Sequence, residues 1–286
     1  MKILVSGGTG FLGSKVVNSF LNKGHEITVL FRENNKIVDQ NHRNLHYLKY
    51  KEIYNENNFN DFDAIFYCAT RYSYLKGEII ELLDANLILP LNLLKTAYKN
   101  GIKYFINIDT IIDKNINEYS ASKSSLRYWI QKFDGSTNIV NIRIDHFYGP
   151  GDKSSKFINN MILSLLNNKK SIDFTKGDQE RSFIYIDDVI NAISLIIENL
   201  DDQKSYQEYN IAGKKSYSIK YIVERIKYLT NNNTTKLLWG KLPYRENETF
   251  KTKCNLSEIN SIGWDQETDL DSGLNKTINY YKKWNI

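Results

Sequence analysis

The sequence predicts an α/β fold in which a doubly wound, parallel sheet is joined to a smaller C-terminal α/β lobe. Short apolar runs alternate with amphipathic stretches of helical spacing through the first half of the chain. The first of these runs is followed directly by a glycine-rich turn and a helical pattern. After Pro150 the strand-like runs become shorter, and no Pro- or Ser-rich linker separates the two halves.

The opening of the chain follows the order strand, turn, helix, strand. The apolar run 2–6 predicts a strand, residues 11–22 carry apolar side chains at helical spacing, and Gly24 ends that helix. Further strands are expected at 27–31, 64–68, 105–108 and 140–144, with helices at 82–99 and 119–133. Strands that alternate with helices form parallel sheets, because right-handed crossovers place the helices on both faces.

The second half predicts a mixed lobe that is built onto the first domain. Helices are expected at 156–166, 187–198 and 219–229, and a strand-like piece at 182–186. We expect residues 1–165 to form the first domain, with about 178–200 returning to it, and residues 166–286 to form mainly the second lobe.

The composition of this 286-residue chain is that of a globular protein, with 41% hydrophobic and 25% charged residues. No apolar run is long enough to span a membrane, and we expect no secretory signal. Cys68 and Cys254 give neither a disulfide framework nor metal-ligand spacing, so we expect a cytoplasmic protein without a metal site. The net charge of +5 comes from scattered lysines and does not predict nucleic-acid binding.

The sharpest motif is the glycine-rich segment 7–13, GGTGFLG, which joins the first strand to the first helix. Gly7 permits a tight turn, Gly10 lets the backbone approach a pyrophosphate, and Gly13 allows close helix–strand packing. The phosphates of a dinucleotide would lie at the positive N-terminus of the helix. The alternative is a structural glycine turn, but the strand before the motif and the helix after it favour a dinucleotide site.

The residue after the second strand indicates the type of dinucleotide. Arg32 stands there, and an arginine at this place accommodates the 2′-phosphate of NADP(H), whereas an acidic residue binds the ribose hydroxyl of NAD(H). Glu33 follows directly and keeps NAD(H) open, and Arg32 is alternatively a solvated surface residue. The sequence favours NADP(H).

The pattern Tyr-x-x-x-Lys occurs at 47/51, 72/76, 119/123 and 128/132, so the spacing alone identifies no site. One helical turn places both side chains on one face, where an ammonium lowers the pKa of a phenol from about 10 and makes it a usable general acid. Tyr119 and Lys123 follow a strand at the ligand-binding edge and open a helix. Thr110 adds a hydroxyl at the same edge, whereas Tyr128 is expected to be buried or solvent-facing.

With these motifs the chain resembles the extended short-chain dehydrogenase/reductase family of nucleotide-sugar epimerases, dehydratases and reductases over nearly its whole length. The resemblance also rests on segments 143–150 (RIDHFYGP) and 181–188 (RSFIYIDD) and on Asn86, Gly177 and Arg245. It implies a Rossmann domain that binds NADP(H), a lobe that mainly binds a nucleoside-diphosphate sugar, and no nucleic-acid or membrane partner.

The resemblance assigns catalysis to Thr110, Tyr119 and Lys123: the two hydroxyls contact a sugar oxygen, and the lysine binds the nicotinamide ribose. The residues expected to bind the cofactor are Gly7, Thr9, Gly10, Phe11, Leu12, Gly13, Arg32, Cys68, Ala69, Thr70, Tyr119, Lys123, Ile144 and His146. The residues expected to bind the substrate are Arg71, Asn86, Asp109, Thr110, His146, Lys156, Phe157, Arg181 and Arg245. Arg181 and Arg245 are expected to hold the diphosphate, a role that suits a planar guanidinium.

Three features depart from most members of the family. Nine residues separate Thr110 from Tyr119, a shorter span than usual. His146 stands where many members carry an Asn that contacts the substrate, and the third-strand region 47–50 lacks the usual Asp that helps to hold adenine. The resemblance also implies a homodimer formed through helices 86–99 and 119–133, and the apolar surface of the second helix supports it.

Ile111 and Ile112 separate the possible reactions. Family dehydratases carry Asp-Glu at these positions, and fucose-forming epimerising reductases carry a Cys at the second; an isoleucine pair can move no proton. The pair therefore leaves one hydride transfer with Tyr119 as the proton donor. Asp109-Thr110, the short loop after it, and segment 148–152 (YGPGD) with Lys156-Phe157 most resemble the paratose and abequose synthases. We expect an NADPH-dependent C4-ketoreductase of a nucleoside-diphosphate 4-keto-deoxy sugar, with a 3,6-dideoxy sugar as one form, in capsular polysaccharide or lipopolysaccharide synthesis. An NAD-dependent 4-epimerase and a non-catalytic NADP(H)-sensing regulator are the alternatives.

Overall fold

In the computed structural model the chain forms two compact units, and the structure describes residues 1–32, 42–54, 56–59, 61–72, 78–252 and 254–284. The first unit comprises Met1–Ile144, Ile190–Ile211 and Leu256–Gly263, and the second comprises Asp145–Val189, Ala212–Asn255 and Trp264–Ile286. We expected the first domain to reach residue 165 with about 178–200 returning. The first segment of this unit ends at Ile144, the last residue of a strand, and the later segments Ile190–Ile211 and Leu256–Gly263 complete the unit.

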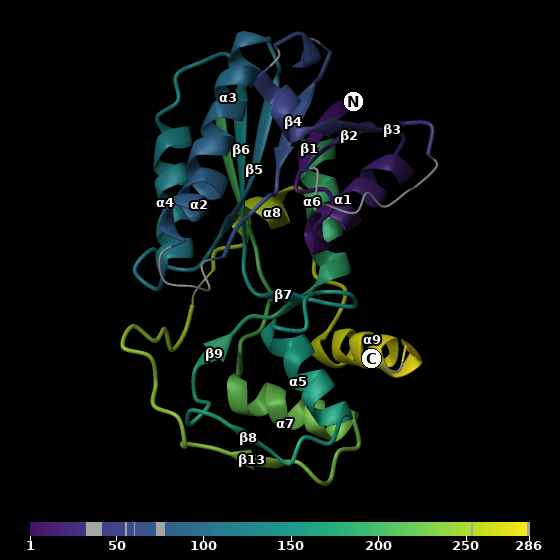
Figure 1. Ribbon diagram of the computed structural model, residues 1–286, viewed down its shortest axis with the longest axis vertical. Coiled ribbons are helices and arrows are strands. Elements are labelled where there is room, and N and C mark those ends of the chain that lie inside the picture. The colour runs from purple at the N-terminus through teal and green to yellow at the C-terminus, as the bar shows by residue number, and fades with distance from the viewer. Residues whose placement is uncertain (33–41, 55, 60, 73–77, 253, 285–286) are drawn as a thin grey trace. The chain divides into compact units, whose positions relative to one another are not determined.

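The first unit is built on a seven-stranded sheet in the order β11-β6-β5-β4-β1-β2-β3, in which each neighbouring pair is parallel (Figure 1). Its strands are β1 (Lys2–Ser6), β2 (Glu26–Phe31), β3 (Leu45–Lys49), β4 (Ala64–Tyr67), β5 (Tyr104–Thr110), β6 (Asn138–Ile144) and β11 (Tyr206–Ile211). The predicted doubly wound sheet is confirmed. The strand order reverses between β1 and β4, and ligands of such sheets bind at the carboxyl ends of the strands beside this point.

Helices cover both faces of this sheet. Figure 1 shows α1 (Phe11–Asn22) and α6 (Ile186–Glu198) on one side, and α2 (Ile79–Leu83), α3 (Leu89–Lys99) and α4 (Glu118–Gln131) on the other. A π-helical turn, η3 (Asp84–Ile88), joins α2 to α3, so the predicted helix 82–99 is interrupted by a wider turn. The remaining elements of the unit are η1 (Tyr50–Tyr54), η2 (Glu56–Phe59) and α8 (Ser257–Ser261).

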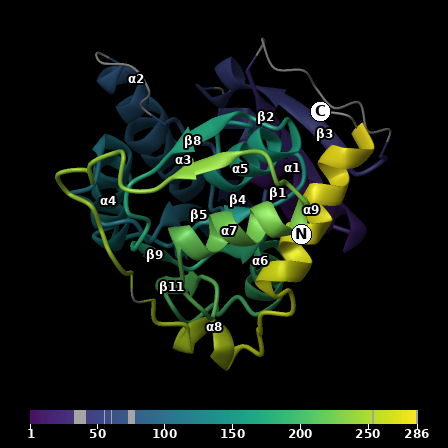
Figure 2. The same ribbon diagram turned by 90° about the horizontal axis from the view of Figure 1, so that it is seen from below.

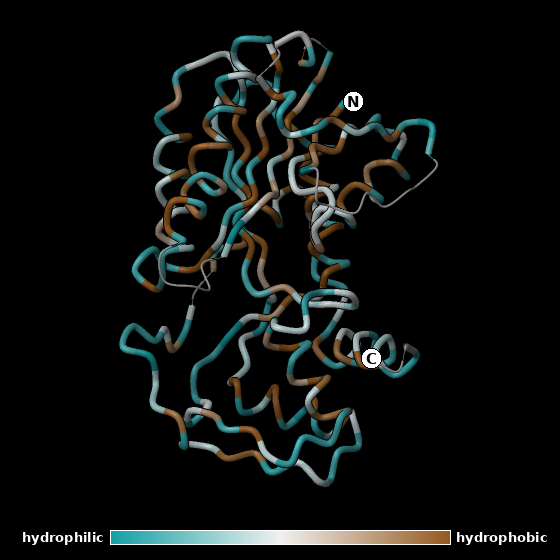
Figure 3. Tube along the Cα trace, viewed as in Figure 1, coloured by the Kyte–Doolittle hydropathy of each residue, from teal (hydrophilic) through white to brown (hydrophobic). Residues whose placement is uncertain are grey.

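The strands form the core of the unit. Leu4, Ile65 and Phe105 are completely buried in one hydrophobic cluster, and Figure 3 shows apolar residues along the central strands. Every residue of β5 is buried, including three polar ones at its carboxyl half, Asn107, Asp109 and Thr110. Buried polar groups need partners, so this strand end must be stabilised by hydrogen bonds.

The second unit is smaller and mixes short strands with helices. Its strands pair as β7 (Phe147–Tyr148) with β10 (Ile184–Tyr185), β9 (Glu180–Arg181) with β12 (Tyr217–Ser218), and β8 (Ser171–Asp173) with β13 (Lys236–Leu238). Figure 2 shows its helices α5 (Phe157–Leu166), α7 (Ile219–Leu229) and α9 (Leu270–Trp284). This unit is the predicted C-terminal α/β lobe.

None of the helices in the described ranges is both long and apolar enough to cross a lipid bilayer. Nor do the His, Cys, Asp and Glu side chains of these ranges gather in groups of three or more that could hold a metal ion.

Candidate active site

The glycine turn after β1 is shaped by close backbone contacts. Gly7 has a φ of +86°, and a Cβ there would lie 2.5 Å from the amide nitrogen of Ala69. A Cβ at Gly13 would lie 2.1 Å from the carbonyl oxygen of Gly7. Gly10 caps α1 without a side chain, and no acidic residue occupies the first turn of that helix. The positive end of α1 is thus accessible to an anion, and these residues fit a dinucleotide.

The other predicted cofactor residues of the first unit border this turn. Phe11 and Leu12 begin α1. Arg32 directly follows β2, whose Leu30 pairs with Ser6, so it lies at the same sheet edge as the turn. It is exposed, and its guanidinium carbon lies 5.5 Å from the centre of the Tyr50 ring. The neighbouring Glu33, which left NAD(H) open, lies outside the described residues.

The segment after β4 lies at the same sheet edge as the glycine turn. The amide and the thiol of Cys68 both donate to the carbonyl oxygen of Ser6, at 3.0 and 3.1 Å. Burial raises the pKa of this thiol to about 12, so Cys68 remains a protonated thiol at neutral pH. Ala69 lies against Gly7, and Thr70 bonds to Asn86 at 3.2 Å.

Asn86 is buried between the loop after β4 and helix α4. Its amide is fully engaged: Oδ1 accepts from the Arg71 backbone at 2.9 Å, and Nδ2 donates to the Arg71 carbonyl and to Ser122. The Ser122 hydroxyl in turn donates to the carbonyl of Tyr119. Asn86 therefore links the loop after β4 to the first turn of α4, and the expectation that it binds the substrate stays a prediction.

Thr110, Tyr119 and Lys123 are brought together at the end of β5 and the start of α4. The Thr110 Oγ1 atom accepts from the Ile112 amide at 3.2 Å, and its hydroxyl forms a hydrogen bond with Tyr119. Lys123 is 2% exposed, and its Nζ donates to the Ile108 carbonyl at 2.8 Å. A capping box stabilises the N-terminus of α4: the Asn117 side chain accepts a hydrogen bond from the Ser120 amide, and the Ser120 side chain accepts one from the Asn117 amide.

The electrostatics of Tyr119 differ from the expectation. Its pKa is raised well above 10, chiefly by burial and further by Tyr72 and Asp109, while the hydrogen bond from Thr110 lowers it. The net shift is upward, so the expected lowering of the Tyr119 pKa was wrong, and this phenol keeps its proton at neutral pH. Burial lowers the pKa of Lys123 to about 8.

Asp109 is buried beneath this group of residues. Its side chain is 0% exposed, and it accepts hydrogen bonds from Arg127 Nε at 2.5 Å and from Asn141 at 3.1 Å. Helix α4 and strand β6 supply the partners of this carboxylate, which no local sequence pattern showed. The expectation that Asp109 binds the substrate stays a prediction.

Two side chains that the sequence analysis did not select lie at this site. The ring of Tyr72 packs on Tyr119 with 4.5 Å between centroids and a 35° angle, and Arg127 contacts both Asp109 and the carbonyl of Thr110. Tyr72 could have been found from its place just after a strand at the ligand-binding edge. Its proposed partner at 76 lies outside the described residues.

The remaining predicted residues of the first unit are placed as follows. Ile144 is buried at the end of β6, and its carbonyl accepts from the Ile111 amide at 3.3 Å. Arg71 forms an ion pair with Glu78 at 3.1 Å, and its Nε atom is buried without a hydrogen-bond partner. Tyr128, which was expected to be either buried or solvent-facing, is 56% exposed and therefore faces solvent.

The second unit contains five predicted residues in two groups. His146 Nδ1 lies 2.5 Å from a carboxylate oxygen of Asp145, and its ring lies 5.5 Å from that of Phe183, on which Phe157 also stacks. Lys156 is the N-cap residue of α5 and is partly exposed. These residues border the aromatic cluster of Phe157 and Phe183.

The two predicted arginines of the second unit lie in different environments. Arg181 donates to Glu248 at 2.5 Å and to the carbonyls of Glu180 and Thr249. Arg245 is exposed in the loop that precedes Glu248. A diphosphate bound to Arg181 would therefore compete with the Glu248 carboxylate.

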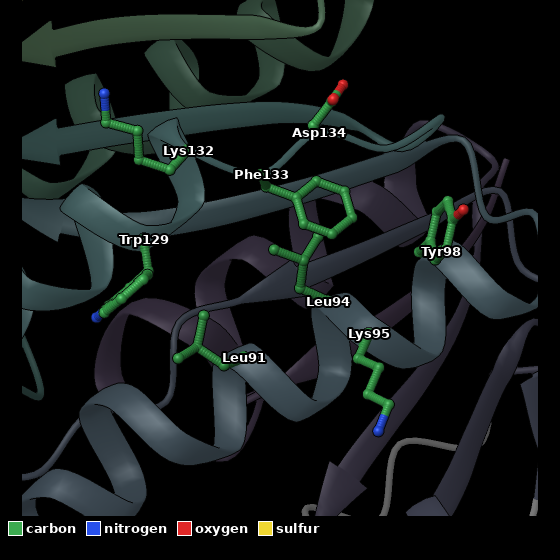
Figure 4. Close-up of a pocket in the computed structure, with 8 residues that line it drawn as sticks. All are labelled: Leu91, Leu94, Lys95, Tyr98, Trp129, Lys132, Phe133 and Asp134. Carbon is green, nitrogen blue, oxygen red and sulfur yellow. The ribbon is translucent and has the colours of Figure 1, made fainter.

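An apolar groove lies between α3 and the end of α4, as Figure 4 shows. The groove is lined by Leu91, Leu94, Lys95, Tyr98, Trp129, Lys132, Phe133 and Asp134. Trp129 is 55% exposed and Tyr98 is 49% exposed. These helices correspond to the ones expected to form a dimer.

The chain matches the sequence model of the NAD dependent epimerase/dehydratase family over residues 3–212. It is 28% identical to the CDP-abequose synthase of Salmonella typhimurium, over 96% of this chain and 97% of that protein. The solved UDP-glucose 4-epimerase of Thermotoga maritima with UDP-glucose has a TM-score of 0.85 at 22% identity and covers 100% of both chains. The Thermus thermophilus UDP-glucose 4-epimerase complex with NAD has a TM-score of 0.81 at 17% identity, with 99% of each chain covered.

Proposed function

The chain belongs to the NAD dependent epimerase/dehydratase family, and from this premise we propose that it is an NADPH-dependent C4-ketoreductase of a nucleoside-diphosphate 4-keto-deoxy sugar. The sugar is proposed to serve surface polysaccharide synthesis. One observation carries the reaction type: Tyr119 and Thr110 share a hydrogen bond beside Lys123, while the buried Ile111 follows Thr110 directly. The full-length similarity to CDP-abequose synthase supports the sugar class.

The proposal assigns each residue a separate task. A bound nicotinamide supplies the hydride in reactions of this kind. Tyr119, which keeps its proton at neutral pH, donates it to the carbonyl oxygen as negative charge develops there. Thr110 holds the same oxygen through its hydroxyl. Lys123, fixed by the Ile108 carbonyl, supplies a positive charge and two remaining donors for the cofactor ribose.

Water elimination is disfavoured at this site. A dehydratase requires an acid and a base close to the sugar carbons that lose water. Ile111 is 8% exposed and Ile112 is half-buried, and neither has a proton to transfer. A single reduction of a carbonyl needs only the proton of Tyr119.

The binding groups follow from the placement of each unit's residues. In the first unit the glycine turn and the start of α1 are proposed to bind the pyrophosphate, and Arg32 the 2′-phosphate. In the second unit Arg181 and Arg245 are proposed to bind the substrate diphosphate.

We also propose that the protein is a homodimer. Trp129, Tyr128 and Tyr98 expose large apolar surfaces on α3 and α4, beside the groove of Figure 4. Exposed apolar patches of this kind favour association, and a two-fold axis would place each groove against its counterpart.

The test is incubation with NADPH and a panel of CDP-, dTDP-, GDP- and UDP-linked 4-keto-deoxy sugars. The proposal predicts consumption of one NADPH for each reduced sugar with at least one of them. A 4-epimerase would instead interconvert 4-hydroxy sugars with no net NADPH oxidation and would retain tightly bound NAD after purification. A non-catalytic regulator would bind NADPH and oxidise none.

A further inference from the structure

The Asp109 carboxylate is an ion buried inside the sheet. It accepts hydrogen bonds from the Nε and Nη2 atoms of Arg127 at 2.5 and 3.3 Å, from Asn141 at 3.1 Å, and from the Thr110 amide at 2.7 Å. A buried charge is stabilised only when it is paired and its remaining lone pairs accept hydrogen bonds. Asp109 meets both conditions, and its nearest neighbour along the chain is the proposed catalytic Thr110.

Arg127 connects two elements of the site. It lies one helical turn after Lys123 and two turns after Tyr119, so the three side chains share a face of α4. Besides its two bonds to Asp109, its Nη2 atom donates to the Thr110 carbonyl at 3.4 Å. The guanidinium therefore ties the helix that carries Tyr119 and Lys123 to the strand end that carries Thr110.

The pair is held from the neighbouring strands as well. Asn141 on β6 donates to Asp109 and also to Glu208 on β11, at 3.0 Å, and Glu208 pairs with Arg143 at 3.3 Å. Two acidic and two basic groups thus balance each other beneath the site. Loss of the Arg127 charge would leave an excess of negative charge on this face of the sheet.

From this geometry we infer that Arg127 is a positioning residue for the proposed reduction: through Asp109 it fixes Thr110 against Tyr119, and it offsets the Asp109 charge. The inference rests on the proposed function for the identity of the reacting groups. The groups that face Tyr119 are Tyr72 from the loop after β4, and Asp109 and Thr110 from β5, while Lys123 follows it on α4. Asp109 raises the pKa of both Tyr119 and Lys123, so its compensation by Arg127 affects both proton equilibria.

The experiment is the pH profile of kcat for four variants: Arg127→Met, Asp109→Asn, the double variant, and the conservative Arg127→Lys. Arg127→Met should lower kcat about 10- to 100-fold, as a small misplacement of reacting groups does. It should also raise the pH at which kcat falls on the alkaline side (the alkaline limb) by about one unit. Without the Arg127 charge, the Asp109 carboxylate raises the pKa values of Lys123 and Tyr119 further. Asp109→Asn should move the limb downward. The double variant should return the limb close to its original position while kcat stays low.

The remaining variants separate charge from geometry. Arg127→Lys keeps the charge but loses the two-point contact, so the limb should stay in place while kcat falls. Arg225→Met removes the Arg225–Asp271 pair, which has contacts of 2.7 and 2.6 Å in the second unit, and should change neither quantity. A fall in kcat in all the Asp109 and Arg127 variants with an unmoved limb would reduce the pair to a structural role and overturn the inference.

A readout without turnover keeps this inference separate from the proposed function. The affinity for NADPH should weaken as Lys123 loses its proton, so its pH dependence reports the same equilibrium in fluorescence titrations. Suppose that the wild-type protein reduces no 4-keto sugar, but the pH at which NADPH affinity falls still rises in Arg127→Met and drops in Asp109→Asn. The proposed function then fails and the charge coupling stands. If NADPH affinity shows no such shift in any variant, the coupling between Arg127 and Lys123 is refuted.

Discussion

The buried ammonium of Lys123 allows a quantitative prediction that depends on no substrate. Its pKa falls from 10.5 to about 8 because burial outweighs the favourable charge of Asp109. A lysine with a lowered pKa in the folded state destabilises the protein while it is charged, below pH 8. That cost is relieved progressively as the pH rises from 8 towards 10.5, where the unfolded chain also loses its proton.

The magnitude follows from the shift. At pH 9.5 the folded group lies about 1.5 units above its pKa, whereas the unfolded group is still almost fully charged. At 1.36 kcal/mol per unit, the contribution of Lys123 to the free energy of unfolding should rise by about 2 kcal/mol between pH 7 and pH 9.5. The Cys68 thiol, with a pKa of about 12, does not titrate in this interval.

The assay is urea denaturation of the wild-type protein and of Lys123→Met at pH 7 and pH 9.5. The wild-type protein should gain about 2 kcal/mol relative to the variant on going to the higher pH. The variant removes the titrating group together with its hydrogen bond to Ile108, so the pH dependence of the difference reports the Lys123 proton. Lys132→Met, which replaces an exposed lysine at the end of α4, serves as the control and should show no such change. A difference that is constant with pH, or that falls, would refute the argument that burial dominates at Lys123.

Three further substitutions test the assigned roles. Tyr119→Phe should lower turnover by about 10²–10⁴-fold with little effect on NADPH affinity, because only the transferred proton is lost. Tyr128→Phe, on the same helix, is the control and should remain active. An inactive Tyr128→Phe with an active Tyr119→Phe would assign the proton donor to Tyr128 instead. Arg32→Ala should narrow the preference for NADPH over NADH, measured as a ratio of kcat/KM, by about 10- to 100-fold, and equal use of both cofactors by the wild-type enzyme would contradict the assignment. Trp129→Glu should convert a dimer into a folded monomer in sedimentation experiments, whereas a wild-type protein found only at 33.4 kDa would exclude the dimer.

The elements of the first unit could be predicted where the signal is local. The bounds of β1 and α1 match the expectation because an apolar run, a glycine turn and a helical period succeed one another in a short segment. Strand β11 was missed because its residues alternate between buried and half-buried, as an edge strand does. Its place beside β6 depends on a pairing that no local pattern records.

The candidate site was predictable as a set of reacting groups but not as a set of contacts. Sequence reasoning selected Tyr119 among four similar pairs by its position after a strand. It could not reveal the buried contacts of Asp109 and Asn86, because their partners come from elements that are distant along the chain. It also gave the wrong direction for the pKa of Tyr119, since burial and the Tyr72 contact are properties of the folded protein alone.

The central claim is a single hydride transfer to C4 of a nucleotide-linked 4-keto sugar. The most direct measurement is NMR of the product formed with NADPH that carries deuterium at nicotinamide C4, examined separately for each of the two labelled faces. Deuterium is expected on sugar C4 from one of the two labelled forms, with one NADP⁺ released per sugar. A product without deuterium at C4 from either form, or a changed sugar with no oxidised cofactor, would contradict it.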